Sequence, residues 1–368
     1  MPLTWFDSTT AIPWTGSETG HAMAFHTNQI DNRNDMNTQA QVSTALRIAI
    51  LDDTQDAVRH LDAFRKLAGH TVSIHTRSES DPVALAAQIG NVDVLVPIRE
   101  RTVINDALLS ALPSLRLISQ TGKGVSHIDT TACTRRGIAV AASGGNPYAP
   151  AELTWALVLA AMRRLPCEVE NAQRGKWQAG TLGTQLRGRV LGILGYGTIG
   201  AIVARYGAAF GMRVIVWGRD GSLARAASDG FEVAASREAF FSESDVLSVH
   251  LRLTEDSRGI IRAEDLALMK SSSVFVNSSR ADLVEPGALL AQLLRGNPGF
   301  AALDAYEVEP AYTDPLFALP NAICSPHLGY VEKDTYEIFF GGAFDNVLAF
   351  AAGQPTNLVN PDVITSRT

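Results

Sequence analysis

Short and almost wholly apolar runs recur along this chain, and most of the segments between them have the pattern of amphipathic helices. The first series of runs covers residues 47–51, 71–75, 92–96, 115–119 and 138–142. Residues 54–68 are expected to form a helix that ends at Gly69. Apolar strands joined by helices are typical of a parallel sheet that is covered on both faces. The sequence therefore predicts an α/β fold.

The same pattern begins again after a long helix that is expected over residues 151–165. The second series of runs covers residues 190–195, 213–217, 245–250, 273–278, 300–305 and 321–325. A second long helix is expected over about 331–352. A chain of 368 residues is also too long for one ordinary core. We therefore expect two doubly wound parallel-sheet domains in one chain.

Residues 1–45 differ in composition from the rest of the chain. They are polar, lack periodicity and contain no long apolar run of the kind found in a secretory signal. We expect a disordered leader, or a true start codon further along the chain, where Met36 is available. In the whole sequence, no apolar run approaches the ~20 residues that a membrane helix needs, so we expect no membrane partner.

Charge and cysteine content exclude further classes of protein. The net charge of −7 argues against a nucleic-acid partner, which would favour a basic face. Cys133, Cys167 and Cys324 lie far apart and form no CxxC or Cys/His cluster. We therefore expect no metal site, and a reduced, cytoplasmic setting.

The glycine-rich turn GYGTIG follows one of these runs and opens an expected helix. This context favours dinucleotide binding, with phosphates held at the helix N-terminus. The alternative is that the glycines only pack a strand–helix corner. The predicted cofactor-binding residues of this turn are Gly195, Tyr196, Gly197, Thr198, Ile199 and Gly200.

The segment IVWGRD lies where an acidic residue usually binds the adenosine ribose of NAD. Here the chain offers Gly218 and Arg219. An acid would repel a 2′-phosphate, whereas an arginine can pair with one, so this segment favours NADP over NAD. The alternative is an NAD enzyme in which Asp220 reaches the ribose and Arg219 stacks on the adenine.

Three further segments carry a resemblance to a known family. VNSSRADLVEPGAL (276–289), LDAYEVEP (303–310) and SPHLGY (325–330) resemble signature segments of the D-isomer-specific 2-hydroxyacid dehydrogenases. That family includes D-3-phosphoglycerate dehydrogenase, hydroxypyruvate/glyoxylate reductase and D-lactate dehydrogenase. The resemblance extends from about Arg47 to Leu358 and includes residues 121–140.

The resemblance implies an architecture. A Rossmann NAD(P)-binding domain (150–327) is inserted into a flavodoxin-like substrate-binding, or catalytic, domain (46–149 plus 328–360). It also implies a homodimer.

The resemblance further implies three catalytic residues, Arg280, Glu309 and His327. Their chemistry suits the reduction of a 2-oxo acid. A guanidinium offers a planar donor fork to a carboxylate and a carbonyl oxygen. An imidazole transfers a proton near neutral pH, and a carboxylate beside it orients the ring. Taken alone, His327 reads equally well as a surface histidine, and Arg280 and Glu309 read more readily as solvated charges or an ion pair. Their joint occurrence after strands of one domain favours catalysis.

Other candidates are tied to the family positions. We add His250, Ser278 and Asp304 to the cofactor-binding set, although a structural role is the alternative for His250. The candidate substrate-binding residues are Arg99, Arg101, Lys123 and Gly124. A solvated turn is the alternative for both arginines. The chain departs from the family pattern at Ala281, where glycine is usual, and at Arg252, where proline is common.

The sequence thus predicts an NAD(P)-dependent oxidoreductase that transfers a hydride between a nicotinamide cofactor and a small anionic D-2-hydroxy or 2-oxo acid. The alternative is a dinucleotide-sensing, corepressor-like binding protein on the same scaffold. A Gln–His pair is typical of the formate dehydrogenase branch of this family. Glu309 in place of the glutamine therefore argues against that branch. Phosphite oxidation stays open at this point.

Overall fold

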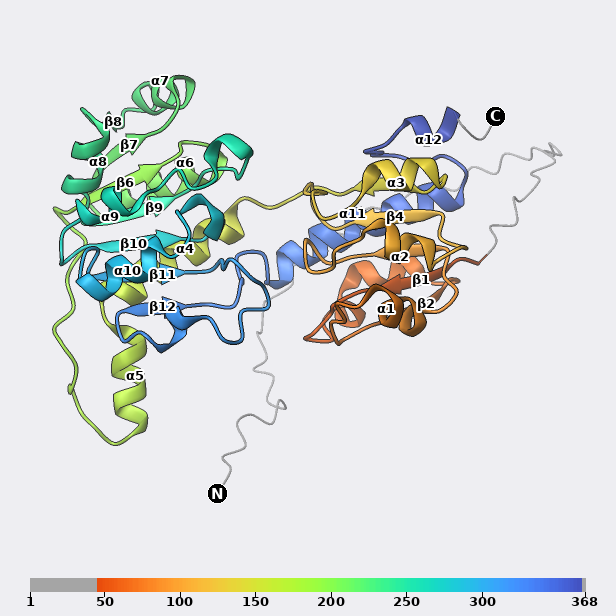
Figure 1. Ribbon diagram of the computed structural model, residues 1–368, viewed down its shortest axis with the longest axis horizontal. Coiled ribbons are helices and arrows are strands. Elements are labelled where there is room, and N and C mark those ends of the chain that lie inside the picture. The colour runs from red at the N-terminus through yellow and green to blue at the C-terminus, as the bar shows by residue number, and fades with distance from the viewer. Residues whose placement is uncertain (1–44, 366–368) are drawn as a thin grey trace, which may run out of the picture. The chain divides into compact units, whose positions relative to one another are not determined.

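The computed structural model describes residues 45–365, so the predicted leader lies almost wholly outside the described residues. The first third of this range forms a five-stranded sheet in which every pair of neighbouring strands is parallel (Figure 1). Its order is β2 (Thr71–Ile74), β1 (Arg47–Ile50), β3 (Val94–Val96), β4 (Leu117–Gln120) and β5 (Ala139–Ala142). The connecting helices are α1 (Pro82–Ile89), α2 (Asp106–Ser110) and α3 (Thr130–Arg135).

The long C-terminal helix α11 (Lys333–Ala351) packs on this first sheet, far from its neighbours in sequence. In Figure 1 it is the blue helix among the orange and yellow elements. Phe340 and Phe344 are buried in one core with Ile48 and Val96. The Ser119 hydroxyl donates to the Ala343 carbonyl at 2.7 Å. The apolar side of the helix therefore completes the core of the first sheet.

The second sheet has seven strands, again all parallel. Its order is β12 (Ala322–Cys324), β11 (Phe300–Leu303), β10 (Val274–Asn277), β9 (Val246–Val249), β6 (Val190–Leu194), β7 (Arg213–Trp217) and β8 (Glu232–Val233). Its helices are α4 (Tyr148–Met162), α5 (Leu165–Gln173), α6 (Thr198–Ala209), α7 (Asp220–Ser228), α8 (Arg237–Glu243), α9 (Ala263–Ala267) and α10 (Ala288–Arg295). The short α12 (Asp362–Thr365) ends the described range. Two parallel sheets with helices confirm the predicted α/β fold.

The strand orders explain where the site residues gather. In the first sheet the order reverses between β1 and β3, and in the second between β6 and β9. Open parallel sheets bind ligands beyond the carboxyl ends of strands at such switch points. All the predicted site residues follow the ends of β3, β4, β6, β7, β9, β10, β11 and β12.

The helix predicted over 54–68 is wrong. The structure has two 3₁₀ helices there, η1 (Val58–His60) and η2 (Asp62–Leu67), separated by the extended Leu61. The Asp53 carboxylate accepts hydrogen bonds from the amides of Ala57 and Val58 at 3.0 and 2.9 Å. Side-chain acceptors of this kind compete with helical hydrogen bonds, so the segment does not continue as an α-helix.

The helix predicted over 151–165 is shifted. It begins at Tyr148 and ends at Met162, and the left-handed Arg164 (φ 56°) separates it from the unpredicted α5. A break at such a residue is expected because a side chain disfavours this conformation inside a helix.

The packing of α11 on the first sheet supports the predicted division of the chain. We propose the boundaries given above, 46–149 plus 328–360 for one domain and 150–327 for the other. Among residues 45–365, no helix is both long and apolar enough to cross a membrane.

Candidate active site

His327 and Glu309 meet in the loops that follow two adjacent strands, β12 and β11. Nδ1 of His327 lies 2.5 Å from Oε2 of Glu309. The other oxygen, Oε1, accepts from the Tyr306 amide at 3.0 Å, which fixes the carboxylate. The Glu309 contact takes up Nδ1 and leaves Nε2 as the ring nitrogen available to a ligand.

The charge of Glu309 is favoured by its neighbours. Burial raises the pKa of this carboxyl, but the hydrogen bond and charge of His327, the Tyr306 amide and the charge of Arg280 together bring it below its usual value. A carboxyl with a lowered pKa stays ionised at neutral pH. Glu309 is therefore a fixed anionic partner for the imidazole.

Asp304 holds the loop that carries His327. Its carboxylate accepts from the Ser325 hydroxyl at 2.5 Å and from the amides of Leu328 and Gly329 at 2.7 and 2.8 Å. His327 itself has a left-handed backbone (φ 54°), which is uncommon for a residue with a side chain and needs such support. The sequence proposed Asp304 as a cofactor contact; the structure shows it bonded to this loop.

Arg280 follows β10, the next strand along the sheet. Its Nη1 donates to the Ser279 carbonyl at 2.7 Å, and its Nη2 pairs with Oε2 of Glu100 at 2.8 Å. Asn277 accepts from the Ser279 amide and donates to the Arg280 carbonyl, which shapes the turn. Two of the five guanidinium N–H groups are thus used within the described residues, and three are left for a ligand.

The glycine turn has the geometry that a dinucleotide needs. Gly195 has a φ of 94°, and a Cβ there would lie 2.9 Å from the His250 carbonyl oxygen. Helix α6 begins beside it, and its N-cap Gly197 provides no side-chain cap. Gly197 and Thr198 are exposed, so the first amides of the helix face solvent. The turn therefore fits a phosphate group at a helix N-terminus.

Three other residues of the cofactor set bond to the protein itself. The buried Tyr196 donates its hydroxyl to Asp229 at 2.6 Å. The His250 ring contacts the Ser248 hydroxyl at 2.8 Å, and burial lowers the pKa of His250 to about 3, so this ring is neutral. Ser278 shares a 2.6 Å hydrogen bond with Thr154. Ile199, in the first turn of α6, is half-buried and packs against the core of the second sheet.

The end of β7 leaves room for the acid that this chain lacks. A Cβ at Gly218 would lie 3.6 Å from the Ser222 hydroxyl and 3.7 Å from the Gly195 Cα, which is ordinary contact. Arg219 and Asp220 are both exposed beside it. Arg225 on the same helix donates to the Tyr196 carbonyl at 2.9 Å, which joins α7 to the glycine turn. Lack of space therefore does not explain the glycine at position 218. What changes at this position is the chemistry, because the negative charge of an acid is missing.

The predicted substrate residues follow the adjacent strands β3 and β4. The Arg99 guanidinium lies 5.6 Å from the Tyr330 ring centre and 5.4 Å from that of Phe339. Lys123 is exposed, and a Cβ at Gly124 would lie 2.6 Å from Oε1 of Glu100. The loop at 122–124 therefore contacts the Glu100 carboxylate.

Arg101 differs from the other predicted substrate residues because its three nitrogens donate to protein groups. They bond the Tyr330 hydroxyl at 2.9 Å, the Asp52 carbonyl at 2.6 Å and the Tyr336 hydroxyl at 3.4 Å. The Tyr330 ring in turn stands edge-on to His327, with ring centres 5.5 Å apart. Arg101 thus fixes a ring beside the imidazole.

Comparison with known proteins decides the family. The model of the D-isomer specific 2-hydroxyacid dehydrogenase NAD binding domain matches residues 155–329. A glyoxylate reductase of Aeropyrum pernix is 40% identical over 271 residues, which cover 71% of this chain and 81% of the relative. The chain belongs to the D-isomer-specific 2-hydroxyacid dehydrogenase family.

Two further matches agree with this assignment. A D-3-phosphoglycerate dehydrogenase of Mycobacterium tuberculosis is 34% identical over 71% of this chain but only 49% of the relative. The crystal structure of a phosphoglycerate oxidoreductase from Vibrio cholerae o395 shares 50% identity and a TM-score of 0.81, over 84% of this chain and 99% of that one. The chain is therefore an oxidoreductase of this family, and the matched NAD-binding domain supports a nicotinamide cofactor.

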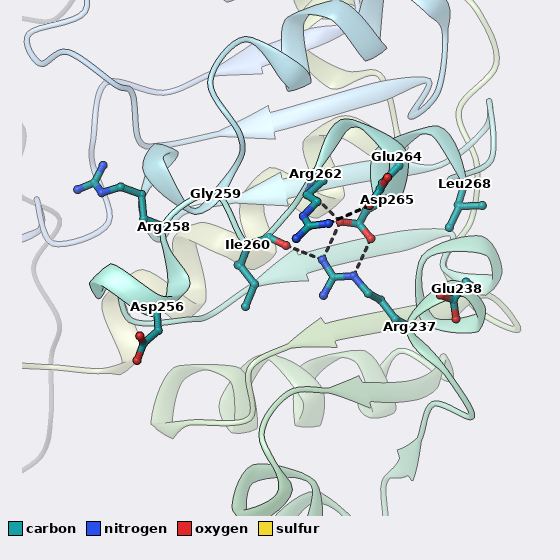
Figure 2. Close-up of a pocket in the computed structure, with 10 residues that line it drawn as sticks. All are labelled: Arg237, Glu238, Asp256, Arg258, Gly259, Ile260, Arg262, Glu264, Asp265 and Leu268. Carbon is teal, nitrogen blue, oxygen red and sulfur yellow. Dashed lines mark hydrogen bonds and ion pairs between the residues drawn. The ribbon is translucent and has the colours of Figure 1, made fainter.

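A separate hollow on the second sheet contains none of the predicted site residues (Figure 2). It is lined largely by charged side chains from α8, η3 (Glu255–Ser257), α9 and the loops between them. Arg237 pairs there with Asp265 at 2.6 Å, and Arg262 pairs with Glu264 at 3.3 Å. Because Arg237 and Arg262 are already paired and no predicted catalytic residue lines the hollow, we do not place the active site of the dehydrogenase there.

Sequence reasoning missed three residues of the dehydrogenase site, Glu100, Asn277 and Tyr330. Glu100 lies inside PIRERT, a segment interpreted only for its two arginines. A charged run directly after an apolar strand is the signal that could have included it.

Proposed function

We propose that this dehydrogenase reduces a small 2-oxo acid to the D-2-hydroxy acid, with Arg280, Glu309 and His327 as the catalytic residues. The contact between Nδ1 of His327 and Glu309 carries the proposal, because it leaves Nε2 free to pass a proton. Arg280 supports it, since its charge acts on Glu309 and its remaining N–H groups can bind an anionic ligand.

The roles follow from general chemistry. The bound nicotinamide supplies the hydride that reduces the carbonyl carbon. His327 donates a proton from Nε2 to the carbonyl oxygen, and it accepts that proton in the reverse direction. Glu309 stabilises the imidazolium and keeps Nδ1 engaged, so that Nε2 is the nitrogen that exchanges a proton. Arg280 binds the carboxylate and carbonyl oxygens through its planar fork, and the amides of the loop at 122–124 add donors.

A substrate panel tests this function. Oxidation of NADPH and of NADH is followed with glyoxylate, hydroxypyruvate and other 2-oxo acids. We expect turnover with at least one of them and faster turnover with NADPH. Tight dinucleotide binding without turnover of any 2-oxo acid would contradict the proposal. Phosphite is tested in a separate assay with NADP⁺ and NAD⁺, because its oxidation would reduce the cofactor.

We further propose NADP as the preferred cofactor. Gly218 removes the acid that would repel a 2′-phosphate, and Arg219 is exposed beside it. Replacing Arg219 with alanine is expected to weaken NADPH binding about tenfold, the loss of one exposed charge-assisted contact. NADH affinity should stay within about twofold. Both dissociation constants are measured by titration of protein fluorescence.

Asp220→Ala is the matched control for Arg219→Ala, since Asp220 is the adjacent exposed charge. An unchanged ratio of NADPH to NADH affinity in Arg219→Ala would contradict the NADP proposal. A selective loss of NADH affinity in Asp220→Ala would instead favour an NAD enzyme.

We propose that the dehydrogenase is a homodimer and that a second copy covers the face formed by α5 and the residues after it. Trp177 is 85% exposed and Leu182 is 95% exposed, and apolar groups gathered on a surface commonly mark an interface. Light scattering is expected to show a dimer for the natural chain and a monomer for the double variant Trp177→Glu and Leu182→Glu. A monomer for both, or a dimer for both, would exclude this interface.

A cytoplasmic location remains part of the proposal. Cys133, Cys167 and Cys324 are all free thiols, which suits a reducing compartment.

A further inference from the structure

Glu100 stands between two groups that we propose to hold the substrate. Its Oε2 accepts from Nη2 of Arg280 at 2.8 Å. Its Oε1 contacts the loop at 122–124, because a Cβ on Gly124 would lie 2.6 Å from it. The side chain is 26% exposed, so the carboxylate is partly open to a ligand. A negative charge therefore lies where an anionic substrate is expected.

Glu100 lies among positive charges before any substrate binds. Burial raises the pKa of Glu100, but the charges of Arg280 and Arg99 and the hydrogen bond from Arg280 bring it below its usual value, so the carboxyl is ionised at neutral pH. Burial lowers the pKa of His127 to about 4, so that ring is neutral. Neither ring nitrogen of His127 has a partner within the described residues. Arg99 and Arg280 thus carry two positive charges against the one negative charge of Glu100, and the exposed Lys123 adds a third positive charge in the loop at 122–124.

The carboxylate of a 2-oxo acid can bind the N–H groups of Arg280 that have no protein partner among the described residues. Glu100 bonds the same guanidinium, so a second substituent on that side of the substrate meets the Glu100 carboxylate. A carboxylate accepts hydrogen bonds but donates none, so a hydroxyl group is compatible with it and an anionic oxygen is not. Like charges at this range in a partly buried site repel strongly enough to change affinity at least about tenfold.

We propose that Glu100 is a specificity-determining residue, which admits 2-oxo acids with a single anionic group and rejects those with a second one, such as a phosphate ester. This inference rests on the proposed function, since it assigns Arg280 and the loop at 122–124 to the substrate. It names the substrate class of that site as 2-oxo monocarboxylates with neutral side chains.

The test compares hydroxypyruvate with its 3-phosphate ester. For each, kcat/KM is measured with the natural chain, with Glu100→Gln and with Glu100→Asp. The natural chain is expected to favour the unphosphorylated acid by about 100-fold or more, and Glu100→Gln should reduce that ratio at least about tenfold, mainly through KM of the ester. Glu100→Asp keeps the charge and should keep most of the ratio.

Glu264→Gln is the matched control, because it removes one carboxylate from the exposed pair with Arg262, where the Glu264 side chain is 74% exposed. Its ratio should equal that of the natural chain. A second measurement needs no variant: raising the ionic strength should narrow the ratio in the natural chain, since salt screens the repulsion.

Several results would overturn the assignment. The assignment is wrong if the ratio of kcat/KM for hydroxypyruvate to that for its phosphate ester in Glu100→Gln stays within about twofold of the natural value. It is also wrong if added salt leaves this ratio unchanged in the natural chain. Equal loss of both activities in Glu100→Gln would mean that Glu100 only positions Arg280. Turnover of hydroxypyruvate in these cases leaves the proposed function intact. No turnover of any 2-oxo acid by the natural chain overturns the proposed function and this inference together.

Discussion

Replacing His327 with alanine is expected to lower kcat for 2-oxo acid reduction by about 10²–10⁴-fold, the usual contribution of a positioned acid–base group. The imidazole is the group placed to protonate the carbonyl oxygen. Its Nδ1 lies 2.5 Å from Glu309, and alanine would leave that carboxylate without a ring to orient. Steady-state rates with a saturating 2-oxo acid measure the effect.

Dinucleotide affinity separates a chemical role from a structural one in this variant. His327 follows β12, whereas the glycine turn follows β6, four strands away from β12 in the sheet. The dissociation constant for NADPH should therefore stay within about twofold of the natural value. His60→Ala, at an exposed histidine, is the control and should leave both quantities unchanged. Equal loss of turnover and cofactor affinity in His327→Ala would show that the histidine is misassigned.

Replacing Arg280 with lysine is expected to lower kcat/KM by about 10²–10³-fold. Lysine keeps the charge but loses the planar fork that bonds two oxygens of one ligand, and each charge-assisted bond contributes roughly 1.5–3 kcal/mol. A lysine ammonium also has three N–H donors where the guanidinium has five. It therefore cannot bond the Ser279 carbonyl, Glu100 and two substrate oxygens together, as the guanidinium can. Rates are measured below the KM of the substrate, where kcat/KM is determined directly.

Arg258→Lys is the control for this variant, since Arg258 pairs with Asp282 at an exposed site, where the Arg258 side chain is 60% exposed. It should keep kcat/KM within about twofold, as surface pairs contribute little. If Arg280→Lys keeps nearly full kcat/KM, charge alone suffices and the proposed two-oxygen contact is wrong.

The strands could be predicted from the sequence because both sheets are parallel and buried. Their residues are continuous apolar runs, so almost every run marked a strand to within two residues of its ends. The edge strand β8 was missed, since it has only two residues, Glu232 and Val233, and neither forms an apolar run. The helix predicted over 54–68 was wrong for another reason. Backbone amides of this segment donate to the carboxylates of Asp53 and of the distant Glu337.

The candidate site was predicted in part. Glu309 and His327 are 18 positions apart and follow adjacent strands, so a parallel sheet brings them together. Glu100 and Arg280 are 180 positions apart and belong to different sheets. No local pattern in the sequence joins Glu100 to Arg280, so their pairing could not be predicted. Arg101 was predicted to bind substrate, but it bonds to the protein. Its partners are far away in sequence, since Tyr330 precedes helix α11 and Tyr336 lies on it.

The central claim is that Arg280, Glu309 and His327 act on one carbonyl group. A crystal structure with NADP and oxamate, an unreactive analogue of a 2-oxo acid, tests it most directly. We predict that the analogue's carbonyl oxygen lies within hydrogen-bond distance of Nε2 of His327 and of the Arg280 guanidinium, with the nicotinamide ring beside it. Oxamate bound away from these side chains, or a His327 ring turned from the ligand, would contradict the account.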